Sequence, residues 1–262
     1  MGVGAMGAPM VERLLAASFP VAFTARRHDV VSRTVALGAT DAGSLRGVAE
    51  ASDVVIVCVY DDAQVRGVCL GPDGLIAAMA PGSTLVNHTT GSPTTAASLA
   101  AEAGPRGVRV LDAALSGGPA DIARGSLTLL VGGDEAVLDD LRPVLAAYSD
   151  PILHVGGLGD GQRIKLVNNA LFGANVALVA EAERVVAALG VDPTLALTAI
   201  AQCSGDSYVL RTVLALGSSA RMRELAGRFI DKDVATVVDV AAEQGVDLGL
   251  LRTAATHEGG AA

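Results

Sequence analysis

The sequence predicts an α/β protein in two parts: a doubly wound, parallel sheet followed by an all-helical domain. Short apolar segments rich in β-branched residues alternate with helical segments up to about residue 155, which is typical of a parallel sheet covered by helices. Beyond Gly161 the pattern is helical only. A third observation is the glycine-rich turn GVGAMG at residues 2–7. We therefore expect a first domain over 1–158 and a second over 159–262.

The opening turn has the spacing GxGxxG, which is typical of a Rossmann-type, dinucleotide-binding domain. The first glycine permits a tight turn, the second lets a pyrophosphate approach the backbone, and the third lets a helix pack on a strand. The pyrophosphate would lie at the N-terminus of a helix expected over 8–17. A strand should precede the motif but only Met1 does, so we expect the first strand to be missing, through a start-site error or a real truncation. The cofactor contacts expected here are Gly2, Gly4, Ala5, Met6 and Gly7, with Val59 at the end of a later strand.

The remaining elements follow in order along the chain. The run DVVIVCV at 53–59 is apolar throughout, as in a strand buried on both faces. Ser44, Ser92 and Asp134 stand where helix N-caps are expected. Strands are expected over 21–24, 53–59, 84–87, 108–113, 127–131 and 151–155. Helices are expected over 32–37, 44–51, 63–69, 75–79, 92–103, 134–145, 161–188, from 193 onward, and over 207–216, 222–229, 232–244 and 248–256, ahead of a GGAA tail without regular structure.

The stretch GGLGDGQRIKLVNN at 156–169 contains Lys165, one of only two lysines in the chain; the other is Lys232. A chain with 19 basic residues, nearly all arginine, has kept lysine where an amine that can release its proton is needed, because arginine cannot do so near neutral pH. Asn169 follows four residues later, one helical turn away. Lys165 would lie at the seam of the two domains, where ligand clefts form. The alternative is an ordinary solvated lysine.

Composition narrows the class of protein. No apolar run reaches the roughly 18 residues that a membrane helix needs, and no signal-peptide pattern is present, so we expect a cytoplasmic protein without a membrane partner. A net charge of −9 and a pI near 4.8 argue against nucleic acid as a partner. Three scattered cysteines and four histidines lack the spacing of metal ligands, so we expect no metal site.

Four separated stretches together resemble one family. They are GVGAMGAPM at the head, NHTTGSP at 87–93, DAALSGGPADIARGSLTLLVGG at 112–133 and GDGQRIKLVNN at 159–169, with KDV at 232–234 as a fifth. Their order is similar to that of the β-hydroxyacid dehydrogenases, which include 3-hydroxyisobutyrate dehydrogenases and tartronate semialdehyde reductases. The resemblance implies a catalytic lysine at Lys165, substrate contacts at Ser116, Gly117, Gly118 and Asn169, a nicotinamide-side hydroxyl at Thr89 or Thr90, and a cofactor-side lysine at Lys232. The two lysines that composition singles out are thus the two that the family would single out.

Arg26 and Arg27 bear on the choice of cofactor. They follow the strand at 21–24, where an enzyme that uses NAD would carry an acid for the ribose 2′-hydroxyl. Arginine suits a 2′-phosphate instead, so we expect NADP, with NAD as the second choice. The alternative is a solvated surface pair.

Three further motifs have alternative interpretations. Ser116 lies in LSGG and not in the GxSxG of a hydrolase nucleophile, so we expect it to donate to a substrate carboxylate. His88 is expected to pack and hydrogen-bond, and the pair Asp61–Asp62 to be solvated, with a general-acid role left open. After SGG the family usually carries Gly-Ala, where this chain has Asp121-Ile122, so the substrate pocket is expected to differ.

The sequence therefore predicts an oxidoreductase that transfers a hydride between NADP(H) and a small carboxylate-bearing β-hydroxyacid or its semialdehyde. Lys165 would donate or accept the proton. We expect a homodimer or homotetramer assembled through the helical domain, although that domain is short. An imine reductase-like enzyme and a non-catalytic or truncated dinucleotide-binding protein remain as alternatives. A 6-phosphogluconate dehydrogenase fits less well, because that family has a histidine beside the asparagine where this chain has Asn168-Asn169.

Overall fold

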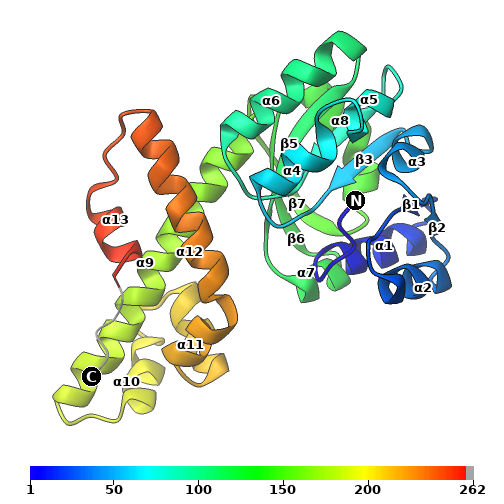
Figure 1. Ribbon diagram of the computed structural model, residues 1–262. Helices are drawn as coiled ribbons and strands as arrows, with labels where there is room; N and C mark the ends of the chain where they lie inside the picture. The colour runs from blue at the N-terminus through cyan, green and yellow to red at the C-terminus, as the bar shows by residue number, and fades with distance from the viewer. Residues whose placement is uncertain (258–262) are drawn as a thin grey trace. The chain divides into compact units, whose positions relative to one another are not determined.

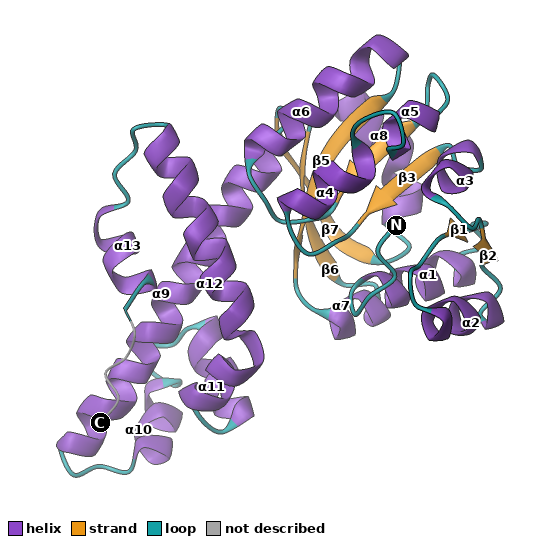
Figure 2. Ribbon diagram, in the orientation of Figure 1, coloured by secondary structure: helices purple, strands orange, loops and turns teal. Residues whose placement is uncertain are grey.

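The computed structural model describes residues 1–257, so the expected GGAA tail lies outside the described part of the chain. The chain divides into two compact units, Met1–Lys165 and Leu166–Ala262. Figure 1 traces the course of the chain, and Figure 2 shows that all strands belong to the first unit while the second is helical. The expected combination of a Rossmann-like sheet with a following helical domain is confirmed.

The main sheet of the first unit has five strands in the order β3-β4-β5-β6-β7. Every neighbouring pair is parallel except β5 and β6, which run antiparallel with Ser116 opposite Thr128. The expectation of a parallel sheet is therefore wrong for this pair, because a direct turn through one short helix reverses the chain between them. The strands are β3 (Val54–Val57), β4 (Thr84–Asn87), β5 (Arg109–Ser116), β6 (Leu127–Gly132) and β7 (Ser149–Gly156).

Two short strands, β1 (Ala22–Phe23) and β2 (Thr40–Asp41), pair in parallel as a separate sheet. Among the described residues no strand joins this pair to β3. Instead the backbone of Met1 runs beside β3: its amino group donates to the carbonyl of Ile56 (2.7 Å), and its own carbonyl accepts from the N–H of Cys58 (3.0 Å). The start of the chain thus lies against the β3 edge, next to the glycine turn.

The helices of the first unit begin at local signals that the sequence carries. Ser44, Ser92 and Asp134 each accept a backbone N–H at the start of their helices, as expected for N-caps. One helix, α7, was not expected. The helices are α1 (Gly7–Ala16), α2 (His28–Ala36), α3 (Leu45–Glu50), α4 (Asp62–Cys69), α5 (Leu75–Ala78), α6 (Pro93–Ala103), the short 3₁₀ helix η1 (Gly104–Arg106), α7 (Pro119–Arg124) and α8 (Glu135–Leu145).

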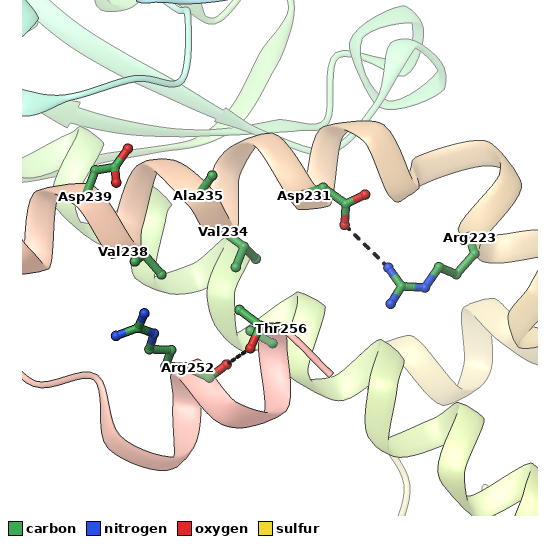
Figure 3. A pocket seen from close by; sticks show the side chains of 9 residues that line it. Arg223, Asp231, Val234, Ala235, Val238, Asp239, Arg252 and Thr256 are labelled. Carbon is green, nitrogen blue, oxygen red and sulfur yellow. Dashed lines mark hydrogen bonds and ion pairs between the residues drawn. The ribbon is translucent and has the colours of Figure 1, made fainter. Parts of the chain in front are cut away.

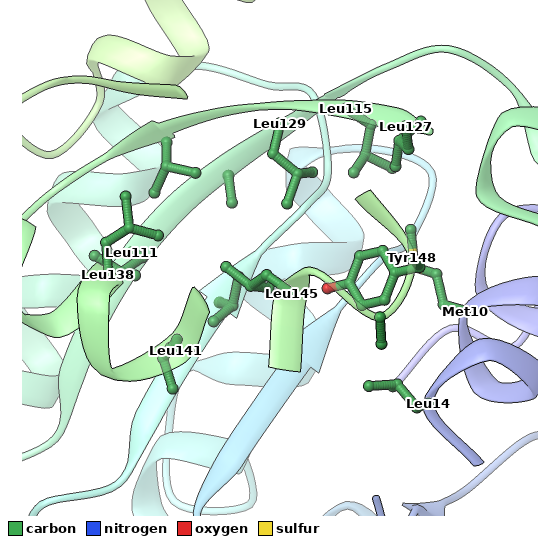
Figure 4. Close-up of a cluster of buried hydrophobic side chains, with 14 of the residues drawn as sticks. Met10, Leu14, Leu111, Leu115, Leu127, Leu129, Leu138, Leu141, Leu145 and Tyr148 are labelled. Atoms are coloured by element: carbon green, nitrogen blue, oxygen red, sulfur yellow. The ribbon is translucent and has the colours of Figure 1, made fainter. Parts of the chain in front are cut away.

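Helices cover both faces of the main sheet, because its strands are apolar on both sides. Along β3, Val55 and Val57 pack into the core with α3 to α6, while the alternate residues Val54 and Ile56 pack toward α1, α7 and α8. The second of these two cores is centred on leucines from β5, β6 and α8, with Tyr148 fully buried beside Met10 of α1 (Figure 4). This packing fixes the strand ends, from which the candidate site residues project.

The second unit is a bundle built on one long helix, α9 (Asp160–Ala188), which begins in the first unit. Its core is formed by apolar residues of α9, α10, α11 and α12, with Val176, Leu210 and Ile230 among the buried side chains. The expectation of two helices over 222–229 and 232–244 is wrong, since α12 runs unbroken through Asp231. The remaining helices are α10 (Pro193–Ile200), α11 (Tyr208–Leu216), α12 (Ser219–Glu243) and α13 (Gly249–Ala255).

Within residues 1–257, no helix combines the length and apolar character required to span a bilayer.

Candidate active site

The glycine turn has the geometry that a dinucleotide pyrophosphate requires. Gly2 has a φ of +96°, and a Cβ there would overlap the carbonyl of Cys58, while a Cβ at Gly7 would overlap the carbonyl of Gly2. A Cβ at Gly4 would meet no atom of the described chain within 4 Å, so the backbone there is open to a ligand. The first N–H groups of a helix such as α1 lack intrahelical partners and attract anions. The residues of this turn therefore fit an NAD(P) pyrophosphate.

The loops after β3 and β4 are tied together beside this turn. The N–H of Val59 donates to Oγ1 of Thr89 (2.9 Å), and the N–H of Thr89 donates to Oδ1 of Asn87 (3.1 Å). Parallel neighbouring strands end at the same edge of a sheet, so Val59 and Thr89, which the sequence analysis named separately as cofactor contacts, lie together. Thr89 is buried and Thr90 half-buried, which makes Thr90 the more accessible of the two candidate hydroxyls.

Lys165 lies on the first turns of α9 and is buried, with 8% of its surface exposed. A buried carboxylate holds the start of this helix. The carboxylate of Asp112, on β5, accepts the N–H groups of Gly159 (2.5 Å) and Gln162 (2.9 Å). Burial raises the pKa of the Asp112 carboxyl above its usual range, and the two N–H donors oppose that rise. The helix that carries Lys165 is thus fixed to the sheet at its N-terminus.

The loop at Ser116, Gly117 and Gly118 lies at the end of β5, where it passes into α7. The N–H of Gly118 donates to Oδ2 of Asp121 (2.7 Å), and the other oxygen of Asp121 pairs with Arg124 (2.5 Å). The Gly118 amide expected to face a substrate is therefore occupied by a carboxylate of the chain itself. This contact is a structural consequence of the aspartate at position 121, where the family usually carries glycine.

Arg26 and Arg27 follow β1 and precede α2, and both are exposed. Arg27 pairs with Asp29 through two hydrogen bonds, which raise the pKa of the guanidinium and lower that of the carboxyl. Arg26 makes no side-chain bond to any residue in the described part of the chain. Of the two candidate phosphate ligands, Arg26 is therefore the one whose donors are available.

The other titratable groups considered near the site have structural partners. His88 is buried between the carbonyl of Ala113 (Nδ1, 2.6 Å) and the hydroxyl of Tyr148 (Nε2, 2.8 Å), and burial lowers its pKa to about 4. Asp61 caps α4 by accepting the N–H of Gln64 (2.8 Å), and Asp62 accepts the N–H of Ser92 (2.8 Å). The expected packing role of His88 fits these contacts, whereas Asp61 and Asp62 serve as acceptors within the fold and are not simply solvated.

In the second unit, Asn169 and Lys232 share one partner. The carboxylate of the buried Asp233 accepts a hydrogen bond from the amide of Asn169 and pairs with Nζ of Lys232 (2.8 Å). The side chain of Asn168 donates in turn to Oδ1 of Asn169 (3.1 Å). The structure thus brings together two residues that the resemblance singled out separately, through an acid that the sequence reasoning missed.

Three polar residues in or beside these clusters escaped the sequence analysis: Asp112, Gln162 and Asp233. Each lies inside a quoted motif, and the available signal was a charged or amide side chain within an otherwise apolar or glycine-rich stretch. No group of three or more potential metal-ligand side chains is found among residues 1–257.

The helical unit also contains a cavity of about 700 Å³ between α12 and α13. Figure 3 shows the ion pair of Arg223 with Asp231 at one end of the cavity; the side chains of Arg252 and Asp239 also line it. None of the candidate catalytic, substrate-binding or cofactor-binding residues lines this cavity. It is a feature of the helical unit separate from the clusters described above.

Two protein-family models match most of the chain. Residues 1–156 match the model of the NAD-binding domain of 6-phosphogluconate dehydrogenase, and residues 159–258 match that of the NAD-binding domain of NADP-dependent 3-hydroxyisobutyrate dehydrogenase. An NAD-dependent L-serine dehydrogenase of Pseudomonas aeruginosa is 37% identical over 210 residues, covering 80% of this chain and 70% of the relative. A 2-hydroxy-3-oxopropionate reductase of Escherichia coli is 33% identical over 210 residues, covering 80% and 72%.

Among solved structures, a 3-hydroxyisobutyrate dehydrogenase of Mycobacterium tuberculosis, in a structure with L-serine, superposes with a TM-score of 0.85 at 29% identity, covering 97% of this chain and 89% of the other. Imine reductases from Myxococcus stipitatus and Streptomyces aurantiacus share the fold at 20–22% identity, with TM-scores of 0.60–0.65.

The dinucleotide turn, the Rossmann-like sheet and the helical unit define an NAD(P)-dependent oxidoreductase acting on CH–OH groups. Within this class, the chain belongs to the β-hydroxyacid dehydrogenase family, as the sequence resemblance implied.

Proposed function

We propose that the enzyme interconverts a small β-hydroxyacid and its semialdehyde or keto form, prefers NADP(H), and uses Lys165 as proton donor and acceptor. The observation that carries the proposal is the position of Lys165. One of two lysines in the chain, it is buried on the helix that Asp112 and Gln162 fix to the sheet, in the same unit as the dinucleotide turn.

Lys165 would act on the oxygen of the reacting carbon. In reduction its ammonium gives a proton to the carbonyl oxygen, and in oxidation its amine takes the hydroxyl proton. The nicotinamide supplies or receives the hydride when the cofactor is bound. A rigid helix start favours this role, because general acid–base catalysis requires the donor to be held within hydrogen-bond reach of the reacting atom.

The substrate carboxylate would be held by the loop after β5 and by Asn169. Ser116 offers a hydroxyl and Gly117 a backbone N–H, and the amide of Asn169 is oriented by Asp233. Because Asp121 occupies the N–H of Gly118, the anionic substrate relies on the remaining donors. The relatives named for L-serine and for 2-hydroxy-3-oxopropionate act on three-carbon carboxylates, which suggests the size of the substrate.

In the first unit the cofactor would be held by the turn at residues 2–7, by Val59, by Thr89 or the more accessible Thr90 on the nicotinamide side, and by Arg26 at the 2′-phosphate. Lys232 is the candidate cofactor contact of the second unit. The preference for NADP rests on the exposed Arg26 and on the absence of an acid at the end of β1. The Pseudomonas relative is named as NAD-dependent, so the choice within this family needs its own measurement.

We also propose that two or four copies assemble through the helical unit. Leu171, Leu178 and Val185 are spaced by seven residues on α9 and are 54%, 59% and 40% exposed. Heptad spacing of apolar residues on one helix face is typical of a helix that packs on another helix. We propose in addition that functional domains follow the limits 1–158 and 159–262.

The test of the central proposal is Lys165→Arg, which keeps the charge, the length and the donors of the side chain. The pKa of an arginine side chain is about 12 or higher, so arginine stays protonated near neutral pH and is a poor proton donor there. We expect the rate of single-turnover hydride transfer with NADPH to fall by on the order of 10²–10⁴, the usual size of a general acid–base contribution. Lys165→Ala should behave alike, while cofactor binding persists.

Lys232→Arg serves as the matched control, since it changes the only other lysine. It should weaken cofactor binding and keep much of the rate. A panel of small hydroxyacids and aldehydes, followed by NADPH absorbance, identifies the substrate to use. If Lys165→Arg keeps a third or more of the parent rate, Lys165 is an electrostatic anchor and the proton comes from elsewhere.

A further inference from the structure

Gln162 joins the loop after β4 to the start of α9. Its side-chain Oε1 accepts the N–H of Gly91 (2.9 Å), and its Nε2 donates to the carbonyl of Thr89 (3.0 Å). The two bonds bracket Thr90, whose backbone is thereby held on both sides. Gln162 is 1% exposed, so neither bond is exchanged for bonds to water.

The backbone of Gln162 is fixed as well. Its N–H donates to Oδ2 of Asp112 (2.9 Å), while Oδ1 of the same carboxylate accepts the N–H of Gly159 (2.5 Å). A Cβ at Gly161 would come within 2.6 Å of Oδ2 of Asp112, so the carboxylate is packed directly against the first turn of α9. A carboxylate at a helix N-terminus is favoured by the free N–H groups and by the helix dipole. Asp112 therefore fixes the position of the Gln162 backbone.

Lys165 follows Gln162 by three residues on α9, which places the two side chains on neighbouring positions of one helix face. Through Gln162, the loop that carries Thr90 and the helix that carries Lys165 share one rigid connection inside the first unit. A shift of this loop relative to the helix would have to break both hydrogen bonds of the Gln162 side chain.

We infer that Gln162 is a positioning residue, which holds Thr90 in register with Lys165 so that the nicotinamide side and the proton donor meet in one geometry. The inference rests on the proposed function of Lys165. Gln162 would act through the backbone on either side of Thr90 and through the start of α9, with Asp112 as its support.

The chemistry explains why an amide stands at this position. The loop offers one donor and one acceptor, and an amide presents the complementary acceptor and donor at every ordinary pH. A carboxylate at the same place would accept from Gly91 but would face the carbonyl of Thr89 without a proton to give. A carboxylic acid, by contrast, has one O–H donor and one carbonyl acceptor and reproduces the pattern of the amide.

Gln162→Glu therefore has a distinctive pH profile. Two carboxyl groups lie near position 162. Asp112 from β5 accepts the backbone N–H of Gln162, and the oxygens of Asp62 from α4 lie against Gly91. Burial and these two acids raise the pKa of the new glutamic acid, whereas the ammonium of Lys165, three residues further along α9, lowers it. Because the position is 1% exposed, we expect burial to outweigh the ammonium and the acid to stay protonated to a higher pH than in water. We expect the turnover number at about pH 8.5 to fall by on the order of 10- to 100-fold, the usual effect of misplacing a reacting group by about 1 Å. Relative to the parent at equal pH, it should recover toward about pH 6.

Gln162→Met keeps the length of the side chain and removes both hydrogen bonds. Its turnover number, relative to the parent at equal pH, should therefore be reduced by the same factor at every pH. Gln244→Glu, at an exposed position at the end of α12, is the matched control and should follow the parent. If Gln162→Glu follows the parent across the pH range, or if Gln162→Met keeps half or more of the parent rate, the positioning role is refuted.

A second readout does not depend on activity. In the cofactor-free protein, hydrogen exchange over residues 89–92 should quicken by on the order of tenfold in Gln162→Met, since the Gly91 N–H loses its acceptor. Exchange over residues 135–145 in α8 should stay at the parent level, which shows that the variant is folded. Unchanged exchange at 89–92 in a folded variant refutes the connection between loop and helix.

The two proposals fail in different ways. If Lys165→Arg loses the rate and the Gln162 variants keep the parent profile, the proposed function stands and this inference is refuted. If Lys165→Arg keeps the rate, the proposed function fails whatever the Gln162 variants do, and the positioning role fails with it.

Discussion

At the scale of single residues, Arg26 and Arg27 show how a neighbouring side chain divides two apparently equivalent arginines. Arg27 is committed to Asp29 by two hydrogen bonds, whereas the donors of Arg26 are available. An exposed ion pair of this kind contributes little to stability, but it does occupy the guanidinium. A 2′-phosphate would therefore find its first partner in Arg26.

We expect Arg26→Ala to raise the Michaelis constant for NADPH by roughly tenfold or more, because a bond to a charged group contributes about 1.5–3 kcal/mol. The constant for NADH should be nearly unchanged, since NADH lacks the phosphate. Arg33→Ala, an exposed arginine in the last turn of α2, is the control. Equal losses with both cofactors, or a preference of the parent for NADH, would show that Arg26 is a surface residue only.

Asp121 is one of the two residues, with Ile122, at which this chain departs from its family beside the proposed substrate loop. Its carboxylate accepts the N–H of Gly118, the amide that we propose as a contact of an anionic substrate. We expect Asp121→Ala to lower the Michaelis constant for carboxylate substrates by about tenfold, which corresponds to one additional charge-assisted hydrogen bond. The turnover number should change little.

A neutral aldehyde without a carboxylate provides the comparison for Asp121→Ala, and its Michaelis constant should stay the same. Asp134→Ala removes a helix-capping carboxylate from α8 and controls for the loss of a cap alone. An unchanged or higher constant for carboxylate substrates in Asp121→Ala would mean that Asp121 serves only to begin α7.

Some candidate site residues carry a signal in the sequence and others do not. Lys165 was identified because lysine is rare in this chain, and Ser116 because of its motif. Asp112, Gln162 and Asp233 were missed because their roles arise from partners 50, 73 and 64 residues away. No local pattern encodes which buried donor such a side chain will meet.

At the scale of elements, the strands and capped helices of the first unit were predictable because each carries a local signal. β3 is an apolar β-branched run, and α6 begins at Ser92 followed by a proline. The antiparallel direction of β6 was not predictable, because a strand buried on both faces reads the same in either direction. The short strand β2 was missed because both of its residues are exposed and carry no apolar pattern.

His88 links three elements, since it follows β4, bonds to Ala113 in β5, and bonds to Tyr148 just before β7. Its pKa is lowered from 6.5 to about 4 by burial. In the unfolded chain the histidine binds a proton below about pH 6.5, whereas in the folded protein it stays neutral down to about pH 4. The free energy of unfolding should therefore decrease as the pH falls from 6.5 to 4, by about 3 kcal/mol.

Denaturant unfolding of the parent and of His88→Gln at several pH values measures this contribution. The variant should be less stable at pH 7, but its stability should decrease less between pH 6.5 and 4, because residue 88 no longer titrates. The other histidines cancel in the difference. Parallel pH curves for the two proteins would contradict the assignment of a buried, neutral His88.

At the scale of the whole molecule, α9 serves two functions. Its start carries Gln162 and Lys165 and is fixed to the sheet of the first unit, while its remaining turns form the scaffold of the helical unit. Residues Val176 and Val179 of this helix enter the bundle core, and the heptad-spaced Leu171, Leu178 and Val185 remain exposed. An assembly formed on that exposed stripe would use the same helix that carries the proposed proton donor.

We expect Leu178→Glu to weaken the assembly more than any loss of folding would explain. In an isologous dimer each substitution occurs twice, and a buried leucine contributes about 1.5–3 kcal/mol. The dissociation constant should therefore rise by on the order of 10²- to 10⁴-fold, which light scattering coupled to size-exclusion chromatography over a concentration series would detect. Leu195→Glu, at a position on α10 that is 66% exposed and outside the stripe, should leave the mass unchanged. If both variants keep the parent mass at every concentration, or if Leu195→Glu dissociates equally, the stripe on α9 is not the interface.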